Sequence, residues 1–233
     1  MIPRRLLEAV GVAALGSALG GGTGAVVGLP FVGAGVGALN GAVSGWRGVY
    51  EWRRSRGVTA FVLDSTWGLL MTSAGLFANA VGLAMPSSGY VPELSYRQNR
   101  HVYRRGFMPR KGFAITLGHV IGGAADVESE RRRRLITDHE DVHCWQARWF
   151  GPLFPVLYGG WMIVGGGVGM VVWLVARRND RFTEVVESSA YFLNPFEWWA
   201  YSRDGYWPPK GKVEGFGWKR PCCRPLAVAR ART

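Results

Sequence analysis

Histidine, cysteine and charge are all scarce in this sequence. Its 233 residues include four histidines and three cysteines, and charged residues make up only 19% of the chain. The cysteines are Cys144, Cys222 and Cys223, with no C-x-x-C spacing. The sequence therefore implies neither a disulfide framework nor a zinc site built from thiolates. So low a share of charge is also unusual for a soluble globular domain.

The charge that is present is strongly basic, with a formal net charge of +12. No nucleic-acid recognition motif accompanies it, so we expect no nucleic-acid partner. The arginines instead form clusters beside apolar runs, which is typical of segments anchored at lipid headgroups. These clusters are Arg4 and Arg5, Arg53 and Arg54, Arg131 to Arg134, and Arg177 and Arg178.

Apolar residues, glycine and tryptophan are abundant. Apolar residues make up 48% of the chain, which also holds 34 glycines and 11 tryptophans. Glycine and interfacial aromatic residues are enriched together in membrane proteins. We therefore expect an α-helical integral membrane protein, a multi-pass protein of a bacterial cell membrane, in contact with membrane lipids. It should have three or four apolar segments and a small α+β element.

The apolar and basic stretches divide the chain into five parts. We expect a glycine-zipper membrane hairpin and basic connector at 1–57, a transmembrane helix at 58–85, an extramembrane α+β element at 86–150, a second transmembrane helix at 151–178 closed by Arg177 and Arg178, and interfacial helices with a basic tail at 179–233. Because every loop is basic, the positive-inside rule does not decide the orientation.

Two ladders of glycine flank Pro30. Glycine recurs at every fourth position, at 16, 20, 24 and 28 before the proline and at 33, 37, 41 and 45 after it. Spacing of four places each ladder on one helix face, where a second helix can approach closely. The pattern predicts a tightly packed helical hairpin that turns near Pro30, and it could also bind other membrane proteins. Segment 31–46 is short, so it could cross the membrane or re-enter it.

Two features between the apolar segments are more local. Asp64 is the only charge in segment 58–85. A carboxylate inside a membrane suggests a functional role, but this one is near the start of the segment, so we expect it to reach the membrane interface. Residues 113–121, "FAITLGHVI", are apolar and partly β-branched, which favours a short strand. The basic stretch before them could form its partner strand.

The clearest chemical motif is His139-Glu140-Asp141-Val142-His143, an HExxH sequence. Residues four apart lie on the same face of a helix, so both imidazoles can reach one metal ion. Neutral imidazole suits zinc. Glu140 could act as the general base, taking a proton from zinc-bound water and returning it to a leaving amine.

A catalytic zinc site needs a third protein ligand and an open position. Our candidate is Glu197 in "NPFEWWAY", where Asn194 and Pro195 predict the start of a helix. Glu184 and Glu187 are weaker alternatives.

These motifs resemble a group of small bacterial zincin-like proteins of the gluzincin type, many of them membrane-associated, and this resemblance implies a metallopeptidase. The resemblance covers about 135–205, and its matching residues are His139, Glu140, His143, Gln146, Gly151, Pro152, Tyr158, Asn194, Pro195, Phe196, Glu197, Ala200 and Tyr201. It implies that His139, His143 and Glu197 are the metal ligands and that Glu140 is the base.

Four neighbouring residues invite other interpretations. Asp138 could cap the helix that carries the motif. Asp204 could hold a ligand histidine, although a surface turn is the simpler reading. His119 fits a structural role in a strand, and Cys144 should face away from the metal.

Two function classes follow from these observations. The first is a membrane-embedded zinc metallohydrolase, a peptidase, that acts on a membrane-presented peptide or a lipid-linked substrate. The second is a non-catalytic accessory subunit of an envelope transport complex with a structural or vestigial metal site. The glycine ladders favour the second class. The intact Glu140 favours the first, because a structural site has no need of a general base.

Overall fold

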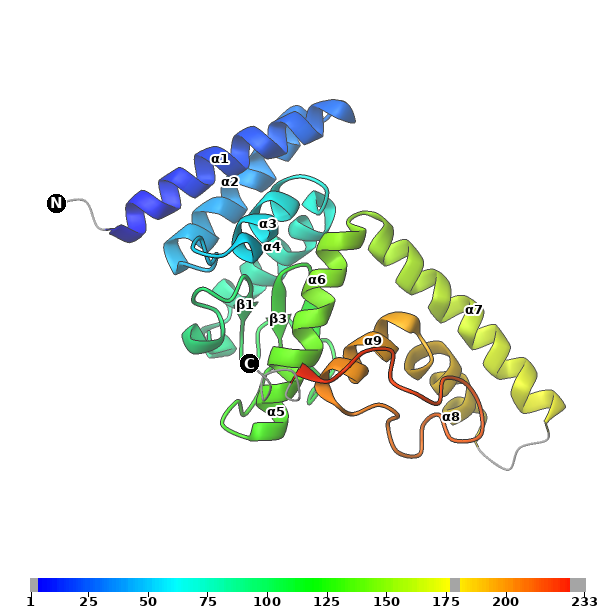
Figure 1. Ribbon diagram of the computed structural model, residues 1–233. Helices are drawn as coiled ribbons and strands as arrows, with labels where there is room; N and C mark the ends of the chain where they lie inside the picture. Colours follow the sequence, from blue (N-terminus) through cyan, green and yellow to red (C-terminus); the bar gives the residue numbers. More distant parts are fainter. Residues whose placement is uncertain (1–3, 177–180, 227–233) are drawn as a thin grey trace. The chain divides into compact units, whose positions relative to one another are not determined.

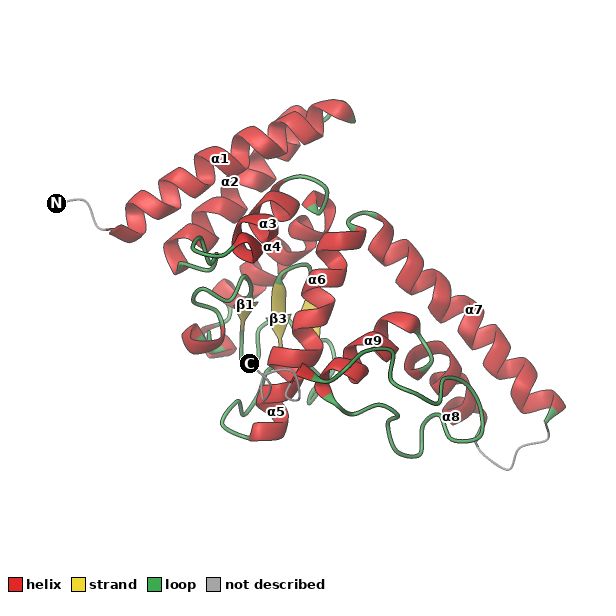
Figure 2. Cartoon of the chain, in the orientation of Figure 1, coloured by secondary structure: helices red, strands yellow, loops and turns green. Residues whose placement is uncertain are grey.

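The computed structural model describes residues 4–176 and 181–226 (Figure 1). The predicted closing pair Arg177 and Arg178 lies outside the described residues. The chain divides into two compact units, Met1–Pro152 and Leu153–Thr233. Helices dominate and one small sheet accompanies them, which confirms the predicted mostly helical class (Figure 2).

The first unit begins with a helical hairpin made of α1 (Arg4–Val26) and α2 (Pro30–Arg47). Pro30 is the first residue of α2, where its missing N–H costs nothing. Gly28 is in the turn with φ of +75°, a conformation that suits glycine. It lies beyond the end of α1 and is therefore not part of the glycine face of that helix. The other ladder glycines are buried between the helices: Gly16, Gly20, Gly24, Gly33, Gly37, Gly41 and Gly45. The predicted glycine-zipper hairpin is thus present.

The two ladders are used within the chain itself. A side chain at Gly37 would collide with the carbonyl oxygen of Gly16, and one at Gly20 with that of Gly33. Since the ladders pack against each other, any contact with other membrane proteins has to use another surface. That predicted partnership stays a prediction.

We expect Gly37→Ala to lower the free energy of unfolding by about 1–3 kcal/mol, because its methyl group forces the helices apart. Gly35→Ala is the matched control, since a methyl group there meets no atom within 4 Å. The control should be neutral or stabilising by up to about 1 kcal/mol, because alanine favours helix more than glycine does. Denaturant unfolding of both variants in detergent measures the difference. Equal losses would argue against close packing at the ladder.

The segment predicted as one transmembrane helix, 58–85, is two helices. α3 (Ser55–Ser65) and α4 (Leu69–Ala84) meet at a 92° bend. The chain leaves the helix at Thr66, and the Thr72 hydroxyl donates to the carbonyl of Asp64 at 2.7 Å across the break. The prediction of a continuous helix is therefore wrong, and a tertiary hydrogen bond stabilises the bend.

Asp64 is buried and does not reach a surface. Both of its carboxylate oxygens accept hydrogen bonds from Arg148, each at 2.9 Å, and Tyr50 donates to it at 3.0 Å. A bidentate arginine pair of this kind holds both charges away from water. The expectation that Asp64 reaches the membrane interface is therefore wrong. Its partner Arg148 lies 84 residues away in the sequence, so no local pattern indicated the pair.

A three-stranded sheet follows, with strands β1 (His101–Val102), β2 (Ile115–Leu117) and β3 (Val120–Gly122) in the order β1-β3-β2. Strand β3 pairs parallel to β1 and antiparallel to β2. The predicted single strand at 113–121 is therefore a hairpin, which turns at Gly118 with φ of +56°. The preceding basic stretch does supply a partner strand, β1, but the pairing is parallel and not the strand and turn of a hairpin that we expected there. Short 3₁₀ turns, η1 (Pro86–Ser88) and η2 (Pro92–Leu94), precede the sheet.

One continuous helical rod closes the first unit. It consists of α5 (Glu130–Arg134), the π-helical turn η3 (Leu135–Glu140) and α6 (Asp141–Phe150). Ile136 and Cys144 on this rod pack with Val102 and Ile121 of the sheet in a buried apolar core. The sheet therefore supports the rod that carries the HExxH sequence.

The second unit contains α7 (Leu153–Val175), α8 (Phe182–Glu187), the π-helical turn η4 (Ser188–Phe192) and α9 (Pro195–Asp204). Gly165 and Gly169 of α7 are buried against η4 and α8. Asn194 caps α9, accepting a hydrogen bond from the N–H of Phe196 at 3.1 Å. The helix start predicted at Asn194 and Pro195 is confirmed.

Two of the described helices, α1 and α7, are long and apolar enough to cross a membrane. Taken together, the bent pair α3 and α4 would be a third such segment.

Candidate metal centre

The two histidines of the HExxH sequence lie where the π-helical turn passes into α6. His139 is in η3 and His143 in α6, and both are buried. Their rings are 5.0 Å apart between centroids, and their Nε2 atoms approach to 3.3 Å. The structure thus brings the two predicted histidines together, one helical turn apart. π-helical turns are frequent at functional sites.

The separation of these two nitrogens can be compared with the geometry of a metal site. Zinc–nitrogen bonds of about 2.0–2.1 Å at a tetrahedral angle place two ligand nitrogens roughly 3.3–3.4 Å apart. The observed 3.3 Å falls at this value. The separation of the two imidazole nitrogens is therefore the one that a shared metal ion would require.

Gln146 fixes the orientation and the tautomer of His143. The Nδ1 of His143 lies 2.8 Å from the amide oxygen of Gln146, which is fully buried. Because an amide oxygen only accepts hydrogen bonds, this contact favours the tautomer with the proton on Nδ1 and the lone pair on Nε2. A metal-binding imidazole needs this arrangement, and the partner of the second nitrogen normally sets it.

Glu140, the predicted general base, is buried beside the sheet. The hydroxyl of Thr116 on β2 donates to its Oε2 at 2.6 Å. This contact positions one carboxylate oxygen and leaves the other for a second partner. Thr116 was not identified from the sequence, since a contact across 24 residues leaves no local signal.

Asp141, inside the motif, anchors the start of α6. It accepts hydrogen bonds from Arg56 at 2.8 Å and from the buried Arg100. Neither arginine was identified from the sequence. Both pairs hold the helix that carries His143 against the rest of the first unit.

Glu197 lies in the first turn of α9 and is buried. The hydroxyl of Tyr158 on α7 donates to its Oε1 at 2.7 Å. A buried carboxylate and two buried imidazoles, Glu197 with His139 and His143, are donors that could hold a metal ion. The histidines belong to the first unit and Glu197 to the second.

Comparison with protein-family models, with curated proteins and with solved structures found no match to this chain. The zincin-like resemblance therefore stays a prediction that rests on the residues themselves.

The weaker acidic candidates lie elsewhere. Glu184 and Glu187 are exposed, and Glu187 pairs with Lys212 at 3.1 Å.

Asp138 does not cap a helix, because the helical rod already begins eight residues earlier, at Glu130. It is buried and accepts a hydrogen bond from Thr137. Asp204 is buried at the end of α9, so the surface-turn reading is wrong for it.

The other two candidates occupy structural positions. His119 is at the turn between β2 and β3, packed against His101 with ring centroids 5.4 Å apart. Burial lowers the pKa of His119 to about 4, so it is neutral at ordinary pH. Cys144 is in the apolar core, where burial raises the pKa of its thiol far above the usual value. These surroundings suit the structural role expected of His119, and the apolar core around Cys144 contains none of the proposed metal ligands, as expected of a thiol that faces away from the metal.

Proposed function

We propose that this chain is a zinc metallohydrolase of a bacterial cell membrane, and that its substrate is a peptide. The observation that carries the proposal is the pair His139 and His143, buried with their Nε2 atoms 3.3 Å apart. Gln146 sets the tautomer that metal binding requires.

Glu197 is the third ligand in this proposal. A catalytic zinc ion takes three protein ligands and keeps one position open. Glu197 is a buried carboxylate oriented by a tyrosine hydroxyl, as ligand carboxylates usually are. The set of two histidines and one glutamate is that of the gluzincin-type proteins that the motifs resemble.

The chemistry follows from the charges at the site. Bound zinc would supply a Lewis acid that lowers the pKa of water and polarises a carbonyl. Glu140 takes the proton from the water that attacks the peptide carbonyl and delivers it to the leaving amine. Water is thereby added across the peptide bond, and a carboxylate and an amine result. Thr116 holds the Glu140 carboxylate in place for both transfers.

The surface of the hairpin supports the membrane location. Its small glycines face inward and its large apolar side chains face outward, the reverse of a soluble hairpin. Among the exposed residues are Leu7, Val10, Leu15, Val32 and Leu39. Helix α7 likewise exposes Ile163, Val164, Val171 and Val175. These segments would hold the site near the membrane, where a membrane-presented peptide or lipid-linked substrate can reach it.

Zinc content of the full-length protein, purified in detergent and measured by mass spectrometry, tests the proposal. We expect about one zinc ion per chain, as a single three-ligand site requires. His143→Ala should abolish binding and Glu197→Ala should weaken it. Gln146→Ala should weaken zinc affinity by about 10–100-fold, because it removes the partner of a ligand. Glu187→Ala is the matched control, since this exposed glutamate lies outside the site. A folded wild-type protein without zinc would overturn the proposal.

A further inference from the structure

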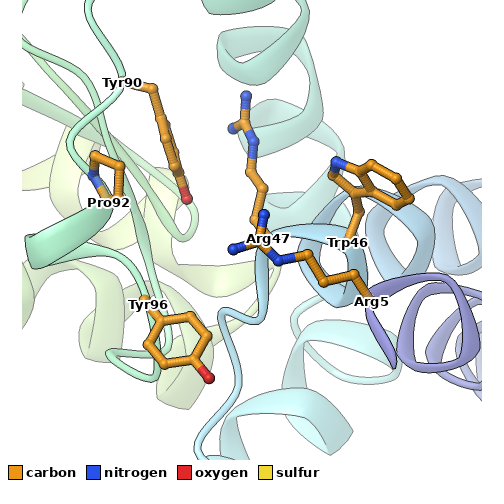
Figure 3. A pocket seen from close by; sticks show the side chains of 6 residues that line it. All are labelled: Arg5, Trp46, Arg47, Tyr90, Pro92 and Tyr96. Carbon is orange, nitrogen blue, oxygen red and sulfur yellow. The ribbon is translucent and has the colours of Figure 1, made fainter. Parts of the chain in front are cut away.

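A hollow of about 390 Å³ opens in the first unit, at the open end of the hairpin (Figure 3). It combines two arginines with three aromatic rings and one proline: Arg5, Trp46, Arg47, Tyr90, Pro92 and Tyr96. Arg5 comes from the first turn of α1 and Arg47 from the last turn of α2. Its size is within the range of small-ligand sites.

Arg47 is a half-buried cation with only neutral partners. One of its terminal nitrogens donates to Tyr103 at 2.7 Å, and approaches Asn79 and His101 at 3.3 Å each. Its guanidinium also lies 3.9 Å from the centre of the Tyr90 ring. Within the described part of the chain no carboxylate pairs with it. A partly buried charge without a counter-ion is costly, and an anion from outside the chain would relieve this cost.

Arg5 supplies a second positive charge to the same hollow. Its side chain extends from α1 toward the two tyrosines (Figure 3). Among the described residues it has no hydrogen-bond or ion-pair partner. The nearby acid Glu8 is already bound by Arg97, at 2.8 Å, and by Trp52. Two guanidinium groups in one hollow therefore lack an anion within the described chain.

The surroundings of the hollow favour a phosphate that belongs to a lipid. Exposed apolar residues follow Arg5 directly along α1, at Leu6 and Leu7. Trp46 and Tyr96, on its rim, are about half exposed, at 52% and 55%. Aromatic residues of this kind gather at the level of lipid headgroups, and arginine suits phosphate through its several parallel donors.

We propose that this hollow binds the phosphate ester of an anionic phospholipid headgroup, held by Arg5 and Arg47. The site rests on the proposed membrane location and is independent of the metal chemistry. A free phosphate ester offers the same anion, so the test below separates the two sources.

Native mass spectrometry of the full-length protein in detergent, titrated with dioleoyl phosphatidylglycerol, measures the binding. We expect one bound lipid per chain, and about tenfold weaker binding in Arg5→Gln, which removes charge-assisted hydrogen bonds. Arg4→Gln is the matched control, because it removes the same charge from the same turn but does not line the hollow. Its affinity should equal that of the wild type.

Equal losses in Arg5→Gln and Arg4→Gln would overturn the proposal, as would equally tight binding of dioleoylglycerol, which has no phosphate. Displacement of the lipid by sn-glycerol 1-phosphate at matching affinity would identify a soluble ester as the ligand and overturn the lipid assignment. Flotation with phosphatidylcholine vesicles tests the membrane location separately. If the protein does not float with the vesicles but binds glycerol phosphate through Arg5, the proposed membrane location is rejected and the anion site is retained.

Discussion

Glu140→Gln should reduce peptide hydrolysis by about 10²–10⁴-fold, the usual contribution of a general base, while leaving the zinc content unchanged. The amide has nearly the same shape as the carboxylate and can still accept a hydrogen bond from Thr116. It cannot take up the proton of the attacking water. A loss of turnover without a loss of metal therefore separates the base from the ligands.

Fluorogenic peptides in mixed micelles, with and without a lipid anchor, provide the assay for this variant. Glu128→Gln is a suitable control, because its side chain is 76% exposed and lies outside the motif. It should hydrolyse peptides at the rate of the wild type. Equal turnover by wild type and Glu140→Gln would reject Glu140 as the base, whatever the metal content.

Arg148→Met should lower the free energy of unfolding by about 3–5 kcal/mol. Arg148 and Asp64 are both buried, and the substitution leaves the carboxylate of Asp64 without its bidentate partner. The cost is chiefly that of an uncompensated buried charge. Denaturant unfolding in detergent measures it.

A double-mutant cycle shows whether this loss belongs to the pair. Asp64→Asn combined with Arg148→Met removes both charges, so the double variant should be more stable than the sum of the two single losses predicts. Arg53→Met, at an exposed arginine, is the control and should change stability by less than about 0.5 kcal/mol. Additive losses in the cycle would contradict a coupled ion pair.

The sequence predicted those features that depend on spacing along one helix. The glycine ladders predicted the hairpin, the four-residue spacing predicted the approach of His139 and His143, and the pair Asn194 and Pro195 predicted the start of α9. Each is a local pattern with a fixed geometric meaning.

The accessory-subunit alternative drew on the same ladders, and it loses that support because they pack within the chain.

The features that the sequence did not predict depend on contacts between distant residues. The bend after Asp64 and the partners Arg148 and Thr116 connect positions that carry no shared periodicity. Asp138 looked like a cap because acidic residues favour helix starts, but the π-helical turn continues the helix through it. The small sheet was only partly foreseen, since a turn at one glycine divides what looked like a single strand.

The packing of α1 against α2 also determines which changes the hairpin can accept during evolution. On its inner face even a methyl group at Gly20 or Gly37 meets the opposite backbone, so these positions tolerate no other residue without a shift of a whole helix. On its outer face Val10 or Leu39 can be exchanged for any apolar residue of similar hydropathy. In related sequences we therefore expect the glycines at every fourth position of the hairpin to vary least. The large apolar residues on its outer face should vary most.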